Sequence, residues 1–240
     1  MAGKHDQIAG SLIQDILSGH YRVSERLPSE RDLAARFDAN RGAVREAMKK
    51  LEQLGLVDVQ PGGARVQDQG DASLDVMGHM LAQGDVPDAT LVDQIMVVTN
   101  HLLGMAAEQA IELASDDEIK HIRSLAKPLM QVGLDQEAHF LARFELMQSI
   151  MTASRNMPLH MIARTLFEQM APNLACLHQY TTFDGSEYSE FAYQLDDALR
   201  QRNKEALRAT FEAFSNLNRE TMMRAIAAAH KDVGQEAISR

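Results

Sequence analysis

Apolar residues recur at the three- and four-residue spacing of amphipathic helices over most of the chain. Residues 6–18 carry one apolar face and end at Gly19. In residues 40–54 the apolar side chains also share one face: Val44, Ala47, Met48, Leu51 and Leu54. This periodicity predicts two amphipathic helices. The second of them ends at Gly55, since glycine commonly follows the last turn of a helix.

A third, shorter helix is predicted between these two. Ser29 stands at the position of a capping hydroxyl, and acidic residues follow it in the first turn. Leu33 and Phe37 lie about one turn apart and give this helix an apolar face. Residues 38–39 form a corner, and Asn40 is a suitable cap for the next helix. Two short helices joined by a tight corner are typical of a helix-turn-helix.

The period changes from helical to alternating after Gly55. Residues 56–59 alternate with period two, and residues 64–66 can pair back with them across the sequence Gln-Pro-Gly-Gly at 60–63. This pattern predicts a β-hairpin with a glycine-rich turn. Added to the two helices, it predicts a winged helix-turn-helix, a fold that places one helix in the major groove of DNA.

Arg41, Arg45 and Lys49 are spaced four residues apart on the predicted second helix of the motif. A basic stripe of this kind is, taken alone, more often only a solvent-exposed face. Its combination with the cap, the corner and the glycine-rich turn favours DNA binding over that plainer interpretation.

The rest of the chain, from about Ser73, shows helical periodicity alone. The polar segment 67–71 has no periodicity and predicts a linker, so the domains are expected at residues 1–70 and 71–240. Six or seven helices with short connections predict a helical bundle, with the last helix ending near Lys231 and a frayed tail after it. The predicted fold class is mainly α: an N-terminal winged helix-turn-helix with a small hairpin, then a C-terminal all-α bundle.

The net charge of −10 argues at first against a nucleic-acid partner. Residues 1–70, however, hold 10 basic and 10 acidic residues, which leaves 24 − 10 = 14 basic and 34 − 10 = 24 acidic residues for the remainder. All of the excess acid therefore lies outside the predicted DNA-binding domain. Affinity for DNA would come from the local basic face and would fall steeply with salt.

The single cysteine, Cys176, excludes an internal disulfide and fits a reducing cytoplasm. We expect it to be a small buried side chain. No run of about 18 apolar residues occurs, so we expect no membrane-spanning helix. The sequence also lacks a nucleophile elbow, a phosphate-binding loop and an H-E-x-x-H motif, and we therefore predict that the protein is not an enzyme.

Three segments resemble the motifs of the GntR family of bacterial transcription regulators. They are Leu-Pro-Ser-Glu-Arg-Asp-Leu-Ala at 27–34, Arg-Gly-Ala-Val-Arg-Glu-Ala at 41–47 and Pro-Gly-Gly-Ala-Arg-Val at 61–66. The resemblance covers about the first 70 residues and implies a DNA-binding regulator, with arginines in the major groove and the wing tip in the minor groove. The residues it implies at the DNA are Arg31, Asn40, Arg41, Gly42, Ala43, Arg45, Lys49, Pro61 and Gly62.

The second domain resembles the helical domain of the FadR-type subfamily, as in the segment Ala-Ser-Arg-Asn-Met-Pro-Leu at 153–159. Many such domains hold a metal ion with one Asp and three His. The matching positions here are Arg143, Met147, Ala192 and Phe214. Because none of these side chains is a useful ligand for such a cation, we predict no metal and no cofactor.

The same resemblance implies an effector site within the bundle, at Thr99, Arg143, Met147 and Phe214. An inward-facing Arg143 would need an acid or an anionic ligand as its partner, which makes an organic acid one candidate effector. A long-chain acyl-coenzyme A is the other candidate, because a metal-free branch of the subfamily binds it. The segment that holds this ligand there has no counterpart in residues 214–219.

Together these features predict a homodimeric transcription regulator that binds a palindromic DNA operator and responds to a small-molecule effector. Twofold symmetry in the protein matches twofold symmetry in the operator. The alternative is a winged-helix scaffold that binds protein partners instead of DNA. The salt dependence of nucleic-acid binding separates the two functions.

Overall fold

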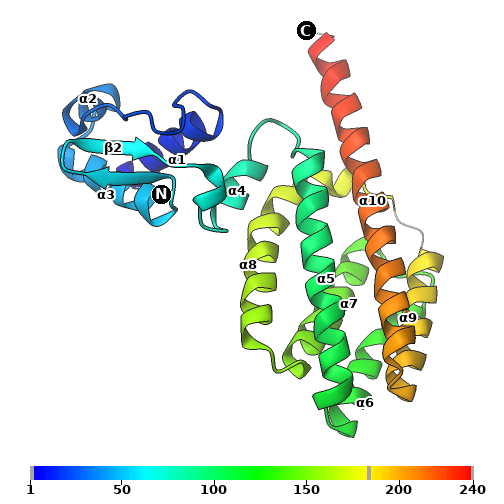
Figure 1. Cartoon of the computed structure of the whole chain (residues 1–240). Helices are drawn as coiled ribbons and strands as arrows, with labels where there is room; N and C mark the ends of the chain where they lie inside the picture. Colours follow the sequence, from blue (N-terminus) through cyan, green and yellow to red (C-terminus); the bar gives the residue numbers. More distant parts are fainter. Residues whose placement is uncertain (1–2, 183–184, 239–240) are drawn as a thin grey trace. The chain divides into compact units, whose positions relative to one another are not determined.

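The computed structural model describes residues 3–182 and 185–238 (Figure 1). The chain divides into two compact units, Met1–Gln83 and Gly84–Arg240. The first unit contains helices and one hairpin, in the order α1 (Lys4–Leu17), α2 (Glu30–Arg36), α3 (Arg41–Gln53), β1 (Val57–Gln60), β2 (Gly63–Val66), the 3-10 turn η1 (Gln69–Asp71) and α4 (Val76–Leu81).

Capping side chains define the start of both helices of the helix-turn-helix. The Oγ of Ser29 accepts a hydrogen bond from the backbone N–H of Asp32 at 3.3 Å, and the Oδ1 of Asn40 accepts one from that of Ala43 at 2.8 Å. Each bond satisfies an N–H group of the first turn that has no partner within the helix. Both predicted caps are confirmed. Asp38, in the corner, adopts a positive φ of 46°, which sharpens the turn.

The core of the first unit lies between α1, α3 and the hairpin. Its most deeply buried apolar side chains include Ile8, Leu12 and Ile13 on α1, Val44 and Leu51 on α3, and Leu56 directly before β1. The two long amphipathic helices predicted from the sequence therefore pack on each other through their apolar faces, and α3 contacts α1, α2 and β1. The opposite face of α3 is left exposed.

The first unit extends beyond Gly70, where the sequence analysis ends the first domain. The backbone N–H of Ser73 donates to the carbonyl of Leu54 at 2.9 Å, and Val76 is buried in the core of the first unit. The segment 67–71, expected as a linker, ends in the turn η1 and leads into α4. The apolar face of α4 completes this core, so the division between the units follows Gln83.

The second unit is helical throughout its described elements, which confirms the predicted fold class. They are α5 (Ala89–Leu113), α6 (Asp116–Ala126), η2 (Lys127–Met130), α7 (Gln136–Ala153), α8 (Met157–Leu174), η3 (Ala175–Tyr180), α9 (Gly185–Gln201) and α10 (Lys204–Ile238). Two expectations were wrong. The last helix continues beyond Lys231 to Ile238, and Cys176 is exposed because η3 turns it away from the core.

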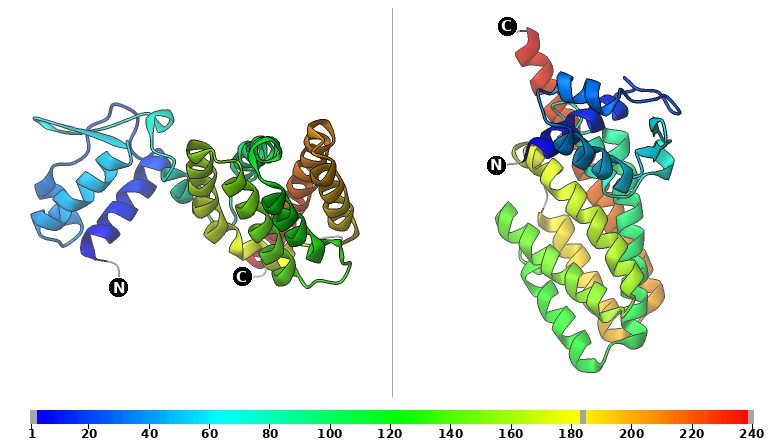
Figure 2. Two further views of the ribbon diagram at one scale, coloured as in Figure 1. Left: turned by 90° about the horizontal axis from the view of Figure 1, so that it is seen from below. Right: turned by 90° about the vertical axis from the view of Figure 1, so that its left-hand side faces the viewer.

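Helix α5 runs through the second unit and contacts α7, α8 and α10. Figures 1 and 2 show α8 and α10 on opposite sides of it. Ala106, Ala107 and Ala110 are fully buried on α5, and their small side chains let neighbouring helices approach closely. In the described part of the chain, no helix is both long enough and apolar enough to cross a membrane.

Candidate nucleic-acid interface

The cations predicted to meet DNA all lie on the exposed side of the helix-turn-helix. The side chain of Arg31 on α2 is 79% exposed and that of Arg45 on α3 is 62% exposed. Arg41 and Lys49 on α3 are exposed as well. Because the apolar face of α3 is buried against α1, the row of Arg41, Arg45 and Lys49 faces solvent along the length of the helix.

Acidic neighbours hold three of these cations, the first being Arg31, whose Nε lies 3.6 Å from Oδ1 of Asp32. The Nε of Arg45 lies 2.9 Å from Oε2 of Glu30, and the Nζ of Lys49 lies 2.9 Å from Oε1 of Glu46. Such exposed pairs contribute only about 0–1 kcal/mol, so a phosphate or a base edge can replace the carboxylate at small cost. The side chain of Arg41 forms no ion pair with any residue that the structure describes. Arg41 therefore has no carboxylate to release before it can contact DNA.

The first turn of α3 is shaped by the Asn40 cap. The Oδ1 of Asn40 is occupied by the cap, so its amide nitrogen remains as a donor for DNA. A Cβ on Gly42 would lie 3.1 Å from that Oδ1, which explains why a glycine suits this position. Ala43 is half-buried and packs against the core of the first unit. Gly42 and Ala43 thus favour the cap and the packing of α3.

The wing is a two-stranded antiparallel hairpin with Gln60 paired to Gly63, so Pro61 and Gly62 form a two-residue turn. Both turn residues are exposed. Gly62 and Gly63 adopt φ angles of 114° and 126°, which only glycine reaches readily. The turn therefore presents backbone with little side chain around it, and backbone of this kind can approach a phosphate closely.

The structure adds one basic residue that the sequence analysis missed. Residues 24–27 pair with β2: the backbone N–H of Leu27 donates to the carbonyl of Ala64 at 2.9 Å, and Arg26 forms a β-bridge with Arg65. The guanidinium of Arg26 lies over the wing, since a Cβ on Gly63 would be 2.6 Å from its Nε. Nothing in the local spacing around Arg26 indicates this pairing.

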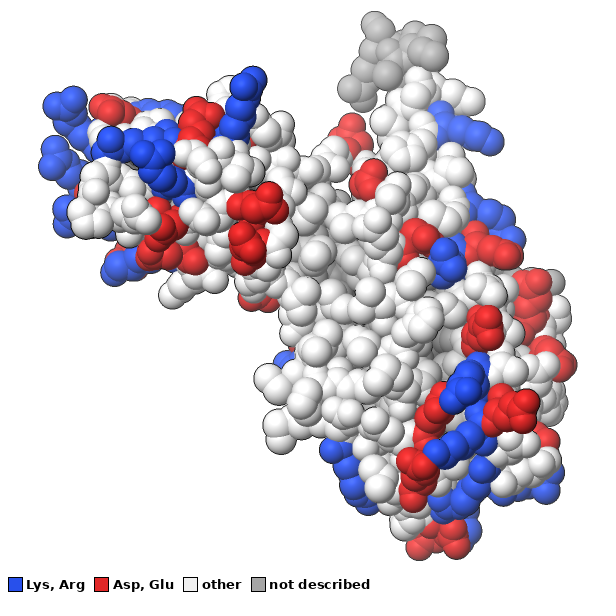
Figure 3. Space-filling model, in the orientation of Figure 1, with Lys and Arg blue, Asp and Glu red and all other residues white. Residues whose placement is uncertain are grey.

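Figure 3 shows Lys and Arg side chains gathered at the end of the first unit that carries α2 and the closed end of the hairpin, at the left of the view. A local concentration of positive charge raises the concentration of a polyanion near this end. It does so although the first 70 residues have no net charge. The site thus combines a basic helix with a glycine-tipped hairpin.

The residues predicted for an effector belong to the second, helical unit. Phe214 on α10 is only 1% exposed and belongs to the core, and Met147 on α7 packs against that core. The Oγ1 of Thr99 donates to the carbonyl of Ile95 on its own helix at 2.9 Å. No hydrogen bond among the described residues ties Thr99 to Arg143.

Arg143, on α7, is turned into the bundle. Its Nη1 donates to Oδ1 of Asn218 on α10 at 2.7 Å, and its Cζ lies 4.7 Å from the centroid of the Tyr188 ring on α9. The ring of Tyr188 in turn makes an edge contact with Phe214 at 6.1 Å. Arg143 and Phe214 are therefore brought together through Tyr188.

This group of residues does not fit the metal ion that FadR-type domains often hold. Arg143 is itself a cation, and Ala192 and Phe214 have no donor atom for a metal. Across residues 3–182 and 185–238, no three His, Cys, Asp or Glu side chains gather into a potential metal site. We therefore assign no role to a metal in the bundle.

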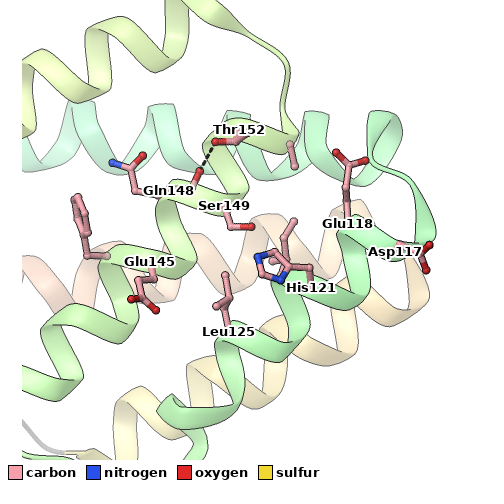
Figure 4. A pocket seen from close by; sticks show the side chains of 11 residues that line it. Asp117, Glu118, His121, Leu125, Glu145, Gln148, Ser149 and Thr152 are labelled. Carbon is pink, nitrogen blue, oxygen red and sulfur yellow. Dashed lines mark hydrogen bonds between the residues drawn. The ribbon is translucent and has the colours of Figure 1, made fainter.

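A groove of about 720 Å³ lies elsewhere in the bundle, between α6 and α7 (Figure 4). Figure 4 shows His121 of α6 and Ser149 of α7 facing it, with Glu118 at one end. Glu118 has a structural role: it accepts hydrogen bonds from the backbone N–H of Ser115 and from Arg155. These bonds lower the pKa of its carboxyl to about 2. The groove does not include Arg143.

The similarity to known protein families lies mainly in the first unit. The family model described as "Bacterial regulatory proteins, gntR family" matches residues 4–66. The HTH-type transcriptional regulator Mce2R of Mycobacterium tuberculosis is 34% identical over 109 residues, 45% of each chain. The probable transcriptional regulator PhnF of Escherichia coli is 29% identical over 130 residues, 52% of each chain. The match spans about half the length of these relatives.

A solved structure extends the likeness of fold to both units. The Listeria monocytogenes protein Lar, described as controlling expression of the agr system, superposes with a TM-score of 0.55. It shares 17% sequence identity, over 94% of this chain and 97% of Lar. At this identity the comparison concerns the fold alone. The sequence match, the capped helices and the glycine-tipped hairpin agree on one conclusion for the first unit: residues 4–66 form a helix-turn-helix domain of the gntR family of bacterial regulatory proteins.

Proposed function

We propose that the protein is a transcription regulator that binds double-stranded DNA through α3 and the wing. The observation that supports this most is the exposed row of Arg41, Arg45 and Lys49 on a capped helix of a gntR-family domain. In this proposal α3 enters the major groove, where arginine reads guanine edges. The turn at residues 61–62 reaches the neighbouring minor groove, and Arg31 and Arg26 contact phosphates.

In the same proposal the regulator acts as a homodimer on a palindromic operator. One recognition helix contacts only a few base pairs, so two identical heads are needed to read a site long enough to be rare in a genome. A twofold axis between the heads requires two half-sites of inverted sequence. The helical unit carries the dimer contacts, and the protein works in the cytoplasm.

We further propose that the helical unit is a FadR-type domain that senses a small-molecule effector. The inward-facing Arg143 supports this assignment, because its buried Nε has no acceptor among the described residues and an anionic ligand would supply one. In the proposal the effector site includes Arg143, with Met147 and Phe214 in the packing around it and Thr99 on the neighbouring α5. Effector binding changes the population of DNA-competent dimers, a coupling that is typically about 1–3 kcal/mol.

The test of DNA binding starts from random-sequence duplexes, from which the full-length protein selects its operator. Fluorescence anisotropy then gives the dissociation constant between 50 and 200 mM salt. A protein that neutralises six to ten phosphates is expected to lose about 10³–10⁵ in affinity over this range. If the protein selects no duplex and binds none at 50 mM salt, the proposal fails and a winged helix that binds protein partners becomes the better interpretation.

The dimer is tested separately, by footprinting on the selected operator. Two protected half-sites in inverted orientation, about one helical turn apart or a multiple of it, are expected for a twofold dimer. Sedimentation velocity of the protein–DNA complex gives the number of chains bound. A single protected half-site with one chain bound would contradict the homodimer while leaving DNA binding intact.

A further inference from the structure

The groove between α6 and α7 is a second place in the helical unit where a small molecule can bind. Its volume of about 720 Å³ lies within the roughly 300–1,000 Å³ that is typical of ligand pockets. In the described part of the chain, none of its lining residues belongs to the cluster of Arg143, Tyr188 and Asn218. The groove is therefore separate from the effector site proposed for the bundle.

The groove arises from small side chains on α7. Helices α6 and α7 pack on each other, but Ser149 and Ala153, one turn apart on α7, are too small to fill the space opposite α6. Larger apolar side chains of α6 form the floor: Ile122 is only 1% exposed, and Leu125 packs against the core of the bundle. A ligand would thus meet an apolar surface that core packing keeps in place.

Polar side chains without a partner in the chain surround this floor. His121 of α6 and both Gln148 and Ser149 of α7 line the groove (Figure 4). None of these three side chains forms a hydrogen bond with any residue that the structure describes. Their donors and acceptors are therefore available to a ligand. A few polar groups that converge over an apolar floor are the usual composition of a small-molecule site.

The groove also carries one negative charge that no residue of the described chain compensates. Asp117 pairs with Lys120 at 2.9 Å. Glu118 pairs with Arg155 at 3.1 Å. Glu145 on α7 forms no ion pair with a described residue, and no described Lys or Arg lines the groove. Figure 4 shows Glu145 at the end of the groove away from Asp117 and Glu118, so the uncompensated carboxylate marks one end.

We propose that this groove binds a small organic monocation, an amine with an apolar body. The ammonium group pairs with the carboxylate of Glu145, and the apolar body lies on Ile122 and Leu125. The ring of Phe144 also lines the groove and packs against the ring of Phe167, with the two centroids 5.1 Å apart. An aromatic ring in the lining favours an organic cation further, because the face of the ring attracts positive charge.

Charge complementarity favours a monocation over other ligands. An organic acid would bring a negative charge to a lining that holds three carboxylates and, among its described residues, no Lys or Arg. A metal ion requires several ligands, and no three His, Cys, Asp or Glu side chains gather anywhere among the described residues. An uncharged apolar ligand would cover the carboxylate of Glu145 without pairing with it, which is costly.

This site goes beyond the proposed function, and its test needs no DNA. Binding is measured on the full-length protein alone. A protein that fails to bind any duplex can therefore still confirm or contradict the amine site.

The probes are butylamine, cyclohexylamine and benzylamine, each compared with the uncharged alcohol of the same carbon skeleton. Putrescine serves as a dication without an apolar end. We expect at least one of the three monoamines to raise the melting temperature of the full-length protein in a saturable way, and its alcohol to give no shift. Isothermal titration calorimetry then gives the affinity of each probe.

The variants test the carboxylate and the space separately. Glu145→Gln is expected to weaken amine binding about fivefold, the upper range for one ion pair at a surface. The matched control is Glu137→Gln, at an exposed acid of the same helix outside the groove, which leaves binding unchanged. Ser149→Leu fills the groove and is expected to abolish the binding of every probe.

A direct readout covers the case in which Ser149→Leu fails to fold. The side-chain amide signals of Gln148 in a ¹H–¹⁵N spectrum are assigned through Gln148→Met, which removes them, and the amine is expected to shift them as it binds. The proposal is overturned if no monoamine binds, if an alcohol binds as tightly as its amine, or if putrescine binds more tightly than every monoamine. It is equally overturned if Glu145→Gln and Glu137→Gln bind the amine alike, if a folded Ser149→Leu variant still binds it, or if the Gln148 signals stay unmoved.

Discussion

The two units of this protein use arginine in opposite ways. In the first unit Arg41 and Arg45 lie on the exposed face of α3, and Arg45 is held by Glu30 at the surface. In the second unit the Nε of Arg143 is buried beside the Tyr188 ring, and none of the acidic residues that the structure describes pairs with it. An exposed arginine is hydrated and can exchange its partner at small cost. A buried guanidinium nitrogen without an acceptor is costly.

The two regions also differ in how far the sequence predicts them. A local motif predicts the arginines of α3, whereas the surroundings of Arg143 arise only when the chain folds. The arginines of α3 follow from a stripe within thirteen residues. The surroundings of Arg143 come from three helices, with Tyr188 on α9 and Asn218 on α10.

The largest effect is expected at Phe214, which was predicted as an effector contact and lies in the core. Its ring stacks on Phe191 with centroids 4.1 Å apart. Phe214→Ala leaves a cavity in a closely packed interior and is expected to reduce the free energy of unfolding by about 3–5 kcal/mol. Chemical denaturation followed by near-ultraviolet circular dichroism measures this.

The matched control is Met161→Ala on α8, whose side chain is exposed and is expected to change stability by no more than about 0.5 kcal/mol. If Phe214→Ala were as mild as this control, the ring would not be part of the core. Its place beside Tyr188 would then have to be explained by ligand binding alone.

The second effect concerns Arg45. Arg45→Ala is expected to weaken binding to the selected operator by about 1–3 kcal/mol and to relax the sequence preference at one base position. Arg164 on α8 offers a close match, because it is also exposed on a helix and pairs with Glu168 at 2.7 Å. Arg164→Ala is expected to leave DNA affinity unchanged. If the two variants bound the operator with the same affinity in anisotropy titrations, Arg45 would be only a surface residue.

Much of the first unit could be predicted from the sequence, because its structure depends on local chemistry. The caps at Ser29 and Asn40, the end of the helix before Gly55 and the turn at residues 60–63 each follow from residue types within a few positions. The prediction failed where contacts come from distant segments. Arg26 reaches the wing only because residues 24–27 pair with β2, and no periodicity reveals this pairing.

In the second unit the sequence predicts the helices well and their environment poorly. The extent of α10 was underestimated, because helical periodicity weakens towards the end of the chain. The family resemblance placed Arg143 at an effector position, and its inward direction was only a condition of that prediction. Tyr188 and Asn218 were not found at all, because they lie on other helices and become neighbours of Arg143 only through packing. The spacing of residues along the chain does not predict which side chains of three different helices become neighbours.

A third, smaller effect distinguishes stability from DNA binding. It concerns two asparagines, Asn40 and Asn203, which cap their helices in the same way. Asn40 accepts from Ala43 at the start of α3, and Asn203 accepts from Ala206 at the start of α10. Asn40→Ala and Asn203→Ala are each expected to destabilise their own unit by about 1 kcal/mol. Only Asn40→Ala is expected to weaken DNA binding as well. Asn40→Ser keeps a cap and is expected to restore stability, while the loss of the amide donor still weakens binding to the operator.

The smallest effect is expected at Arg26, the basic residue that only the fold places at the wing. If its guanidinium contacts a phosphate, Arg26→Ala should weaken binding to the operator and to unrelated duplexes alike, by about 1 kcal/mol or less near 0.1 M salt. The slope of log K against log salt should fall by about 1. Anisotropy titrations at several salt concentrations measure both quantities. A loss confined to the operator would show instead that Arg26 reads a base, and the wing would then contribute to sequence specificity in addition to the affinity for any duplex.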